Sequence, residues 1–176
     1  LAKHLGATVT TTASPRGRAL VERLGADRII DYTAADFTAI LDQLAGTFDG
    51  AFDLLGGDTL DRTFPLVRRG ATVVSIAGIP EPQTAKKDLG RGPGLALLFW
   101  LISGKTRGLA RRSGTNYRYF FMHPSGPDLE ALGTLVDAGQ LEVVVDRTFP
   151  FASIADAFAY LETGRAKGKV VVSLEG

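Results

Sequence analysis

Hydrophobic residues follow two alternating patterns along the chain: short apolar or β-branched runs, and longer segments with apolar residues three or four positions apart. The first pattern predicts strands and the second predicts amphipathic helices. We expect strands at residues 8–13, 28–32, 50–55, 71–77 and 117–122. We expect helices at residues 15–24, 34–44, 58–66, 94–102 and 128–138. Such alternation predicts βαβ units and a doubly wound parallel sheet of the α/β, Rossmann-like class.

The sequence patterns at both ends of the chain indicate secondary-structure elements outside this sheet. Residues 141–176 predict a strand–helix–strand segment, with apolar runs at 143–145, 149–151 and 170–174 and a helix at 154–162. Residues 1–6 have the pattern of the last turns of a helix that a glycine ends. We therefore expect the first strand of the sheet to lie upstream of this chain.

Composition narrows the chemistry. The chain has 176 residues, 45% of them hydrophobic, and a net charge of +1. The absence of cysteine excludes disulfides, thiolate metal sites and cysteine nucleophiles within this stretch. Only two histidines are present, which argues against a histidine-rich metal site. The apolar run at 95–102 is far shorter than the roughly 20 residues of a membrane span.

A nucleic-acid partner finds little support. The basic residues between Lys105 and Arg118, near two tyrosines, are compatible with a nucleic-acid contact. The balanced charge elsewhere favours a solvated loop instead. Residues 80–93 are likewise expected to form a loop.

Candidate ligand-binding residues come directly after the strands, because doubly wound sheets bind ligands beyond the carboxyl ends of their strands. Ser14, Arg16 and Arg18 come after the first expected strand and supply a hydroxyl and two guanidiniums, which suit a phosphate. No acid between Leu1 and Val21 stands ready to bind ribose hydroxyls, which favours the 2′-phosphate of NADP over NAD. The other interpretation is a capping serine followed by two solvated arginines.

The later strand ends supply weaker candidates. Each has a structural alternative: a half-buried tyrosine, ordinary glycine turns, or core aromatics. No nucleophile elbow, Walker loop or paired metal ligands occur, so no catalytic residue or metal ligand is named. The candidates are Tyr32, Leu55, Gly56, Gly78, Phe120, Phe121 and Met122.

Several segments together resemble a known family. Residues 1–14, the run LGADRIIDY at 24–32 and the run FDLLGG at 52–57 resemble the coenzyme half of medium-chain dehydrogenases/reductases. The zinc-independent NADPH:quinone oxidoreductases are the nearest branch. Later segments are similar to the mitochondrial reticulon-interacting NADPH oxidoreductases and their bacterial relatives, namely residues 117–122, 135–139, 146–151 and 168–172.

The resemblance implies an NADP-binding Rossmann-like domain at residues 1–140, without its first strand and its glycine-rich turn. Residues 141–176 would return to complete a catalytic domain that lies upstream. The reaction implied is hydride transfer from NADPH to a quinone or an activated enone or enal. The isolated fragment would then be inactive. We expect a small-molecule substrate, no nucleic-acid partner, no membrane span and a cytoplasmic location.

The resemblance also implies roles for the candidate residues. Ser14, Arg16 or Arg18, and Tyr32 would hold the adenosine 2′-phosphate. Leu55, Gly56 and Gly78 would line the ribose and nicotinamide. Phe120, Phe121 and Met122 would approach the nicotinamide, and the strand at 117–122 would form the edge of a homodimer.

Two alternatives remain open at this point. One is a zinc-dependent alcohol dehydrogenase whose metal ligands lie upstream. The other is a non-catalytic nucleotide-binding or interaction module.

Overall fold

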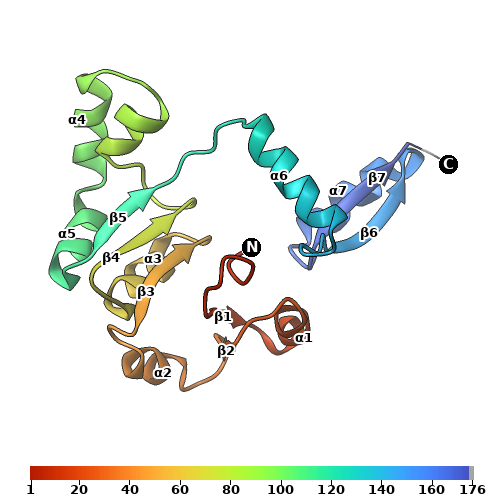
Figure 1. Cartoon of the computed structure of the whole chain (residues 1–176), viewed down its shortest axis with the longest axis horizontal. Coiled ribbons are helices and arrows are strands. Elements are labelled where there is room, and N and C mark those ends of the chain that lie inside the picture. Colours follow the sequence, from red (N-terminus) through yellow and green to blue (C-terminus); the bar gives the residue numbers. More distant parts are fainter. Residues whose placement is uncertain (175–176) are drawn as a thin grey trace. The chain divides into compact units, whose positions relative to one another are not determined.

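The computed structural model describes residues 1–174, and the chain divides into two compact units. The first unit comprises Leu1–Ala34 and the chain from Ser125 onward, and the second comprises Ala35–Pro124. Figure 1 shows the helices and strands of both units with their labels. Residues 175 and 176, the last of the expected return segment, lie outside the described residues.

The N-terminal part of the first unit is a βαβ element. Strands β1 (Thr10–Ala13) and β2 (Arg28–Asp31) pair in parallel and are joined by helix α1 (Pro15–Arg23). The helix begins where the sequence predicts, because Ser14 is extended and the fixed φ of Pro15 suits the first helical position. Residues 1–7 form a turn in which the Ala7 N–H donates to the Ala2 carbonyl (3.0 Å).

The C-terminal part of the first unit contains the expected strand–helix–strand segment. Helix α6 spans Gly126–Asp137 and is capped by the Ser125 hydroxyl, which accepts the Asp128 N–H at 3.3 Å. Parallel strands β6 and β7 come next, with helix α7 between them. Both apolar runs before the expected helix contribute residues to the single strand β6. The elements are β6 (Val145–Pro150), the short 3-10 turn η3 (Phe151–Ser153), α7 (Ile154–Glu162) and β7 (Lys169–Ser173).

The second unit is built on a three-stranded parallel sheet with the order β3–β4–β5. Its strands are β3 (Phe48–Asp53), β4 (Val67–Ser75) and β5 (Asn116–Tyr119). The sheet is accompanied by α2 (Phe37–Gln43), α3 (Gly57–Thr63), the 3-10 turn η1 (Phe64–Leu66), the π-helical turn η2 (Thr84–Asp88), α4 (Pro93–Ile102) and α5 (Gly104–Ser113).

The core of the second unit lies where α3, η1 and α5 meet β4. Phe64 is fully buried, and its ring meets the Tyr117 ring edge-to-face with 5.9 Å between centroids. Burial alternates along the second half of β4, which places every other residue against this core. The buried cluster consists of Leu60, Phe64, Val67, Ala71, Val73 and Ala110.

The described strands form three ladders, in the orders β1–β2, β3–β4–β5 and β6–β7. Every paired strand is parallel to its neighbour, as the sequence predicts.

Three local expectations were wrong. The basic run at 105–112 is helix α5 and not a loop, because it packs Thr106 and Ala110 against the unit. The loop at 80–93 contains the π-helical turn η2, with Thr84 and Ala85 fully buried. The strand expected at 117–122 ends at Tyr119, so the next three residues lie beyond the strand. Tertiary packing decided each case.

No helix in the described part of the chain is long and apolar enough to cross a bilayer. The most apolar one, α4, has 10 residues.

We predict that Phe64→Ala lowers the free energy of unfolding by about 3–5 kcal/mol, since it leaves a cavity under β4. Chemical denaturation measures this change. The matched control is Phe52→Ala on β3, where the side chain is 62% exposed and the expected change is within about 0.5 kcal/mol. Equal losses in the two variants would contradict this view of the core.

Candidate functional site

The carboxyl ends of β3, β4 and β5 form one edge of the second unit. Asp53 pairs with Ser75, and Ser75 pairs with Tyr119, so the three strands end in register. The ladder continues for one more residue on each side of β4. The Ile76 N–H donates to the Asp53 carbonyl (3.1 Å), and the Phe120 N–H donates to the Ser75 carbonyl (2.9 Å). The residues after all three strands therefore lie along a common edge.

A buried carboxylate organises this edge. Asp53 is 5% exposed, and its carboxylate accepts the N–H groups of Leu55 (3.2 Å) and Gly56 (3.1 Å). It also accepts the hydroxyl of Ser75 at 2.6 Å, and that hydroxyl accepts the Ala77 N–H at 3.2 Å. A carboxylate with several donors is satisfied without a cation. Asp53 thus ties the turn after β3 to the turn after β4.

The two turns meet backbone to backbone. Gly56 has φ +69, and a Cβ atom there would collide with the carbonyl oxygen of Ala77. A Cβ atom at Gly78 would meet the Tyr117 hydroxyl, and would lie 2.8 Å from Leu60 Cδ2 and 2.9 Å from the Ser75 hydroxyl. Both positions therefore require glycine for packing alone.

Tyr117 forms a hydrogen bond to the segment that follows β4. Its hydroxyl donates to the Ile79 carbonyl at 2.8 Å. Burial raises the pKa of the Tyr117 hydroxyl well above its usual value, with smaller contributions from the Asp53 and Glu81 charges. The hydroxyl therefore stays protonated and remains a hydrogen-bond donor.

Apolar side chains stand free around this edge. Leu55 is 71% exposed, Phe120 44%, Phe121 42% and Met122 75%. The structure thus brings together all the candidates that come after β3, β4 and β5, and it leaves their side chains outside the core. A polar backbone bordered by exposed apolar side chains suits a flat ring with a polar substituent.

The candidates that come after β1 and β2 lie in the first unit. Ser14 is half-buried, and its carbonyl accepts the N–H groups of Gly17 (2.9 Å) and Arg18 (3.1 Å). Within the described chain its hydroxyl makes no capping bond to α1, contrary to the expected capping role. Arg16 and Arg18 are exposed, and Tyr32 is 54% exposed.

Sequence reasoning missed two charged residues of the first unit. Asp31, at the end of β2, accepts the Thr33 hydroxyl (2.7 Å) and the Thr33 N–H (2.8 Å). These bonds lower the pKa of the Asp31 carboxyl, and the charge of Arg18 adds to the effect. Lys167 donates to the Arg16 carbonyl (2.7 Å) across 151 residues of sequence. Asp31 had a signal, since it ends a strand beside Tyr32, whereas Lys167 had none.

Among residues 1–174, no group of three or more His, Cys, Asp and Glu side chains is arranged to hold a metal ion.

Comparison with known proteins decides the family. The model of the family described as zinc-binding dehydrogenase matches residues 24–172. The chain belongs to the zinc-binding dehydrogenase family. Its members include relatives that cover nearly the whole chain, which confirms the resemblance drawn from the sequence.

One such relative is the mouse (Mus musculus) protein named NAD(P)H oxidoreductase RTN4IP1, mitochondrial. It is 36% identical, and the match covers 98% of this chain and 43% of the relative. A second is the Arabidopsis thaliana protein named NADPH-dependent alkenal/one oxidoreductase, chloroplastic, with 33% identity over 98% of this chain and 36% of the relative.

Solved structures of the family agree with the fold. The quinone oxidoreductase from Coxiella burnetii superposes with a TM-score of 0.74 at 26% identity, over 99% of this chain and 47% of that chain. This similarity confirms the Rossmann-like α/β class. The chain spans less than half the length of each of these three proteins.

We predict that Ser75→Ala lowers the free energy of unfolding by about 1–3 kcal/mol, because the buried Asp53 carboxylate loses a donor. Thermal and chemical denaturation measure this loss. The control is Thr134→Ala, which removes a hydroxyl bonded to the Glu130 carbonyl on exposed helix α6 and should cost about 0.5 kcal/mol or less. A loss at Ser75 no larger than at Thr134 would show that the pair is not a structural link.

Proposed function

We propose that this chain is the cofactor-binding part of an NADPH-dependent oxidoreductase that transfers a hydride to a quinone or to an activated enone or enal. The observation that carries this proposal is the shared edge of β3, β4 and β5. There, two turns that contain Gly56 and Gly78 lie side by side, next to exposed apolar residues. The names of the mouse and Arabidopsis relatives and of the Coxiella burnetii structure support the reaction class.

The residues of the second unit fit the nicotinamide half of the cofactor. Gly56 and Gly78 lie in the two turns at this edge, and we assign them to the ribose and the nicotinamide. Leu55 borders the same edge and is assigned to the ribose. Phe120, Phe121 and Met122 supply an apolar wall for the nicotinamide ring. NADPH itself, when bound, supplies the hydride, and the protein orients it and excludes water.

The residues of the first unit fit the adenosine half. Arg16 and Arg18 are exposed cations in the first turn of α1, where the helix N-terminus also favours an anion. Within the described residues the Ser14 hydroxyl makes no capping bond to α1, so it can donate to a phosphate oxygen. Tyr32 is assigned to the same phosphate.

The decisive experiment compares NADPH and NADH binding in the full-length polypeptide. We expect the double variant Arg16→Ala, Arg18→Ala to weaken NADPH binding about tenfold or more, because it loses charge-assisted bonds to the 2′-phosphate. NADH binding should stay within about twofold, since NADH has no 2′-phosphate. Fluorescence titration of each nucleotide measures both constants.

The matched control is Arg111→Ala with Arg112→Ala, which removes two exposed arginines from the last turn of α5. This control should leave both nucleotide affinities unchanged. An equal loss of NADPH and NADH affinity in the Arg16 and Arg18 variant would contradict the proposed phosphate site.

The family description keeps a zinc-dependent alcohol dehydrogenase as the second candidate. Residues 1–174 offer no metal site of their own, so no step of the reaction is derived through a metal. Metal analysis of the full-length protein distinguishes the candidates: stoichiometric zinc that alcohol oxidation requires favours the dehydrogenase. NADPH binding without turnover of any quinone, enone or alcohol favours a non-catalytic module.

The domain division stays part of the proposal. We assign residues 1–140 to cofactor binding and residues 141–176 to a segment that completes the catalytic domain. The parallel pair β6–β7 with α7 supports the second assignment, because two paired strands alone make a small sheet that gains stability from further strands. The isolated fragment is accordingly proposed to be inactive.

The assembly is proposed to be a homodimer through β5. Among the described residues β5 pairs only with β4, and a free strand edge is a template for pairing with another chain. We expect sedimentation of the full-length protein to give a dimer mass. A monomer at all micromolar concentrations would contradict this assembly.

The location is proposed to be the cytoplasm. The names of the mouse and Arabidopsis relatives place those two proteins in mitochondria and chloroplasts. Cell fractionation of the full-length protein separates these outcomes.

A further inference from the structure

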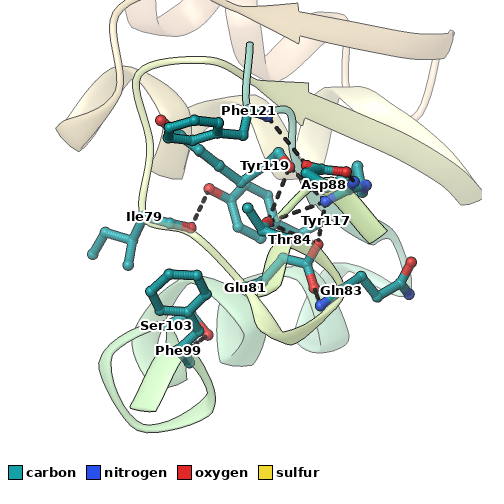
Figure 2. A network of polar contacts seen from close by, with 11 residues as sticks. Ile79, Glu81, Gln83, Thr84, Asp88, Phe99, Ser103, Tyr117, Tyr119 and Phe121 are labelled. Carbon is teal, nitrogen blue, oxygen red and sulfur yellow. Dashed lines mark hydrogen bonds and ion pairs between the residues drawn. The ribbon is translucent and has the colours of Figure 1, made fainter. Parts of the chain in front are cut away.

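Arg118 on β5 joins three segments of the second unit through a polar network. Figure 2 shows the network with Glu81, Thr84 and Asp88 labelled. Its Nη1 atom donates to Glu81 Oε1 (2.8 Å), to Thr84 Oγ1 (3.1 Å) and to the Tyr119 carbonyl (2.6 Å). Its Nη2 atom donates to the Asp88 carboxylate. The side chains of Glu81, Asp88 and Arg118 are 5%, 12% and 20% exposed.

The network holds the backbone just beyond the end of β5. The Tyr119 carbonyl accepts both the Arg118 guanidinium and the Thr84 hydroxyl, the latter at 3.1 Å. The Phe121 N–H donates to Asp88 at 3.2 Å, although it lies beyond the ladder. The intervening Phe120 N–H is held by β4 itself. The network therefore holds the Tyr119 carbonyl and the Phe121 N–H, while β4 holds the Phe120 N–H between them.

The same network orders the segment after Gly78. Glu81 accepts the Gln83 N–H (2.6 Å), and Thr84 is fully buried at the start of η2. A π-helical turn is rare and often occurs at functional sites. Arg118 thus connects the loop after β4 to the strand end after β5.

The chemistry of these side chains argues against direct contact with a ligand. The guanidinium is shared between two carboxylates, a hydroxyl and a carbonyl, and the acidic side chains are almost completely covered. What remains accessible is the apolar wall they support, Phe120, Phe121 and Met122. Because the network is largely buried and the apolar wall is exposed, the network affects a ligand through the position of that wall.

We propose that Arg118, Glu81, Thr84 and Asp88 are positioning residues for hydride transfer. They hold the Tyr119 carbonyl and the Phe121 N–H at the edge where the nicotinamide ring is proposed to bind, so this inference rests on the proposed function. Hydride transfer depends on the approach geometry, and a misplacement of about 1 Å can cost up to about a hundredfold in rate. Cofactor affinity depends mainly on other contacts, so the rate constant should change more than the binding constant.

The experiment uses Asp88→Ala in the full-length polypeptide, with the quinone or enone that the wild type reduces best. We expect kcat and the single-turnover rate of NADPH oxidation to fall about tenfold, because the Phe121 N–H and Arg118 each lose a partner. The Kd for NADPH should stay within about twofold. Stopped-flow absorbance and fluorescence titration measure the two quantities.

The matched control is Asp49→Ala, which removes the Asp49–Arg68 ion pair (2.7 Å) on the same sheet, where both side chains are largely exposed. This variant should keep the wild-type kcat. The inference is overturned if Asp88→Ala keeps a kcat within twofold of Asp49→Ala. A rise in the NADPH Kd as large as the fall in kcat also overturns it.

A second pair of variants guards against simple unfolding. Thr84→Ser keeps the hydroxyl that holds the Tyr119 carbonyl, and Thr84→Val removes it at nearly constant volume. We expect Thr84→Ser to transfer hydride at close to the wild-type rate and Thr84→Val several-fold more slowly. Equal rates in the two variants contradict the inference.

Hydrogen exchange separates this inference from the proposed function. We expect Asp88→Ala to raise amide exchange in the peptide that contains Phe121, and Asp49→Ala to leave it unchanged. If the wild type reduces neither quinones nor enones, the proposed function fails while the exchange comparison still tests the positioning role. Unchanged exchange at Phe121 in Asp88→Ala overturns that role.

Discussion

The hydrogen bond between the Asp53 carboxylate and the Ser75 hydroxyl is the contact on which the candidate site depends. It joins two strand ends that are 22 residues apart in sequence, and both partners are buried. The carboxylate also holds the turn at Gly56, while the hydroxyl holds the turn at Ala77. A buried acid without these donors would carry a large desolvation cost, so the turns and the pair stabilise each other.

The rest of the edge depends on this contact. With the two turns held together, only glycine fits at positions 56 and 78, because other protein atoms fill the space of a Cβ atom there. The Ser75 carbonyl then extends the ladder to Phe120, and the Arg118 network holds the residues on either side. The polar side chains of Asp53, Ser75 and Arg118 bond to each other or to the backbone, so the side chains exposed at this edge are mainly apolar. This division of labour suits a site in which the cofactor supplies the chemistry.

Much of the site was predictable because strand ends and turn glycines have local signals. Leu55, Gly56 and Gly78 lie at or just beyond the end of a predicted strand, and Phe120 lies in the last part of another; the structure places them on one edge. Asp53 and Ser75 were not found, since each ends a strand as an ordinary polar residue. Arg118 was grouped with a basic run of solvated residues, and the acids that bury it lie 30 and 37 residues away.

The sequence by itself determined the βαβ order, the start of α1 at Ser14-Pro15 and the identity of α7, because periodicity, caps and turn residues act over a few positions. Tertiary structure alone decided that α5 is a helix, that β5 ends at Tyr119, and which strands pair in the ladders β1–β2, β3–β4–β5 and β6–β7. It also decided which polar groups meet. The physical reason is that register and burial bring together residues tens of positions apart, and no local pattern records such contacts.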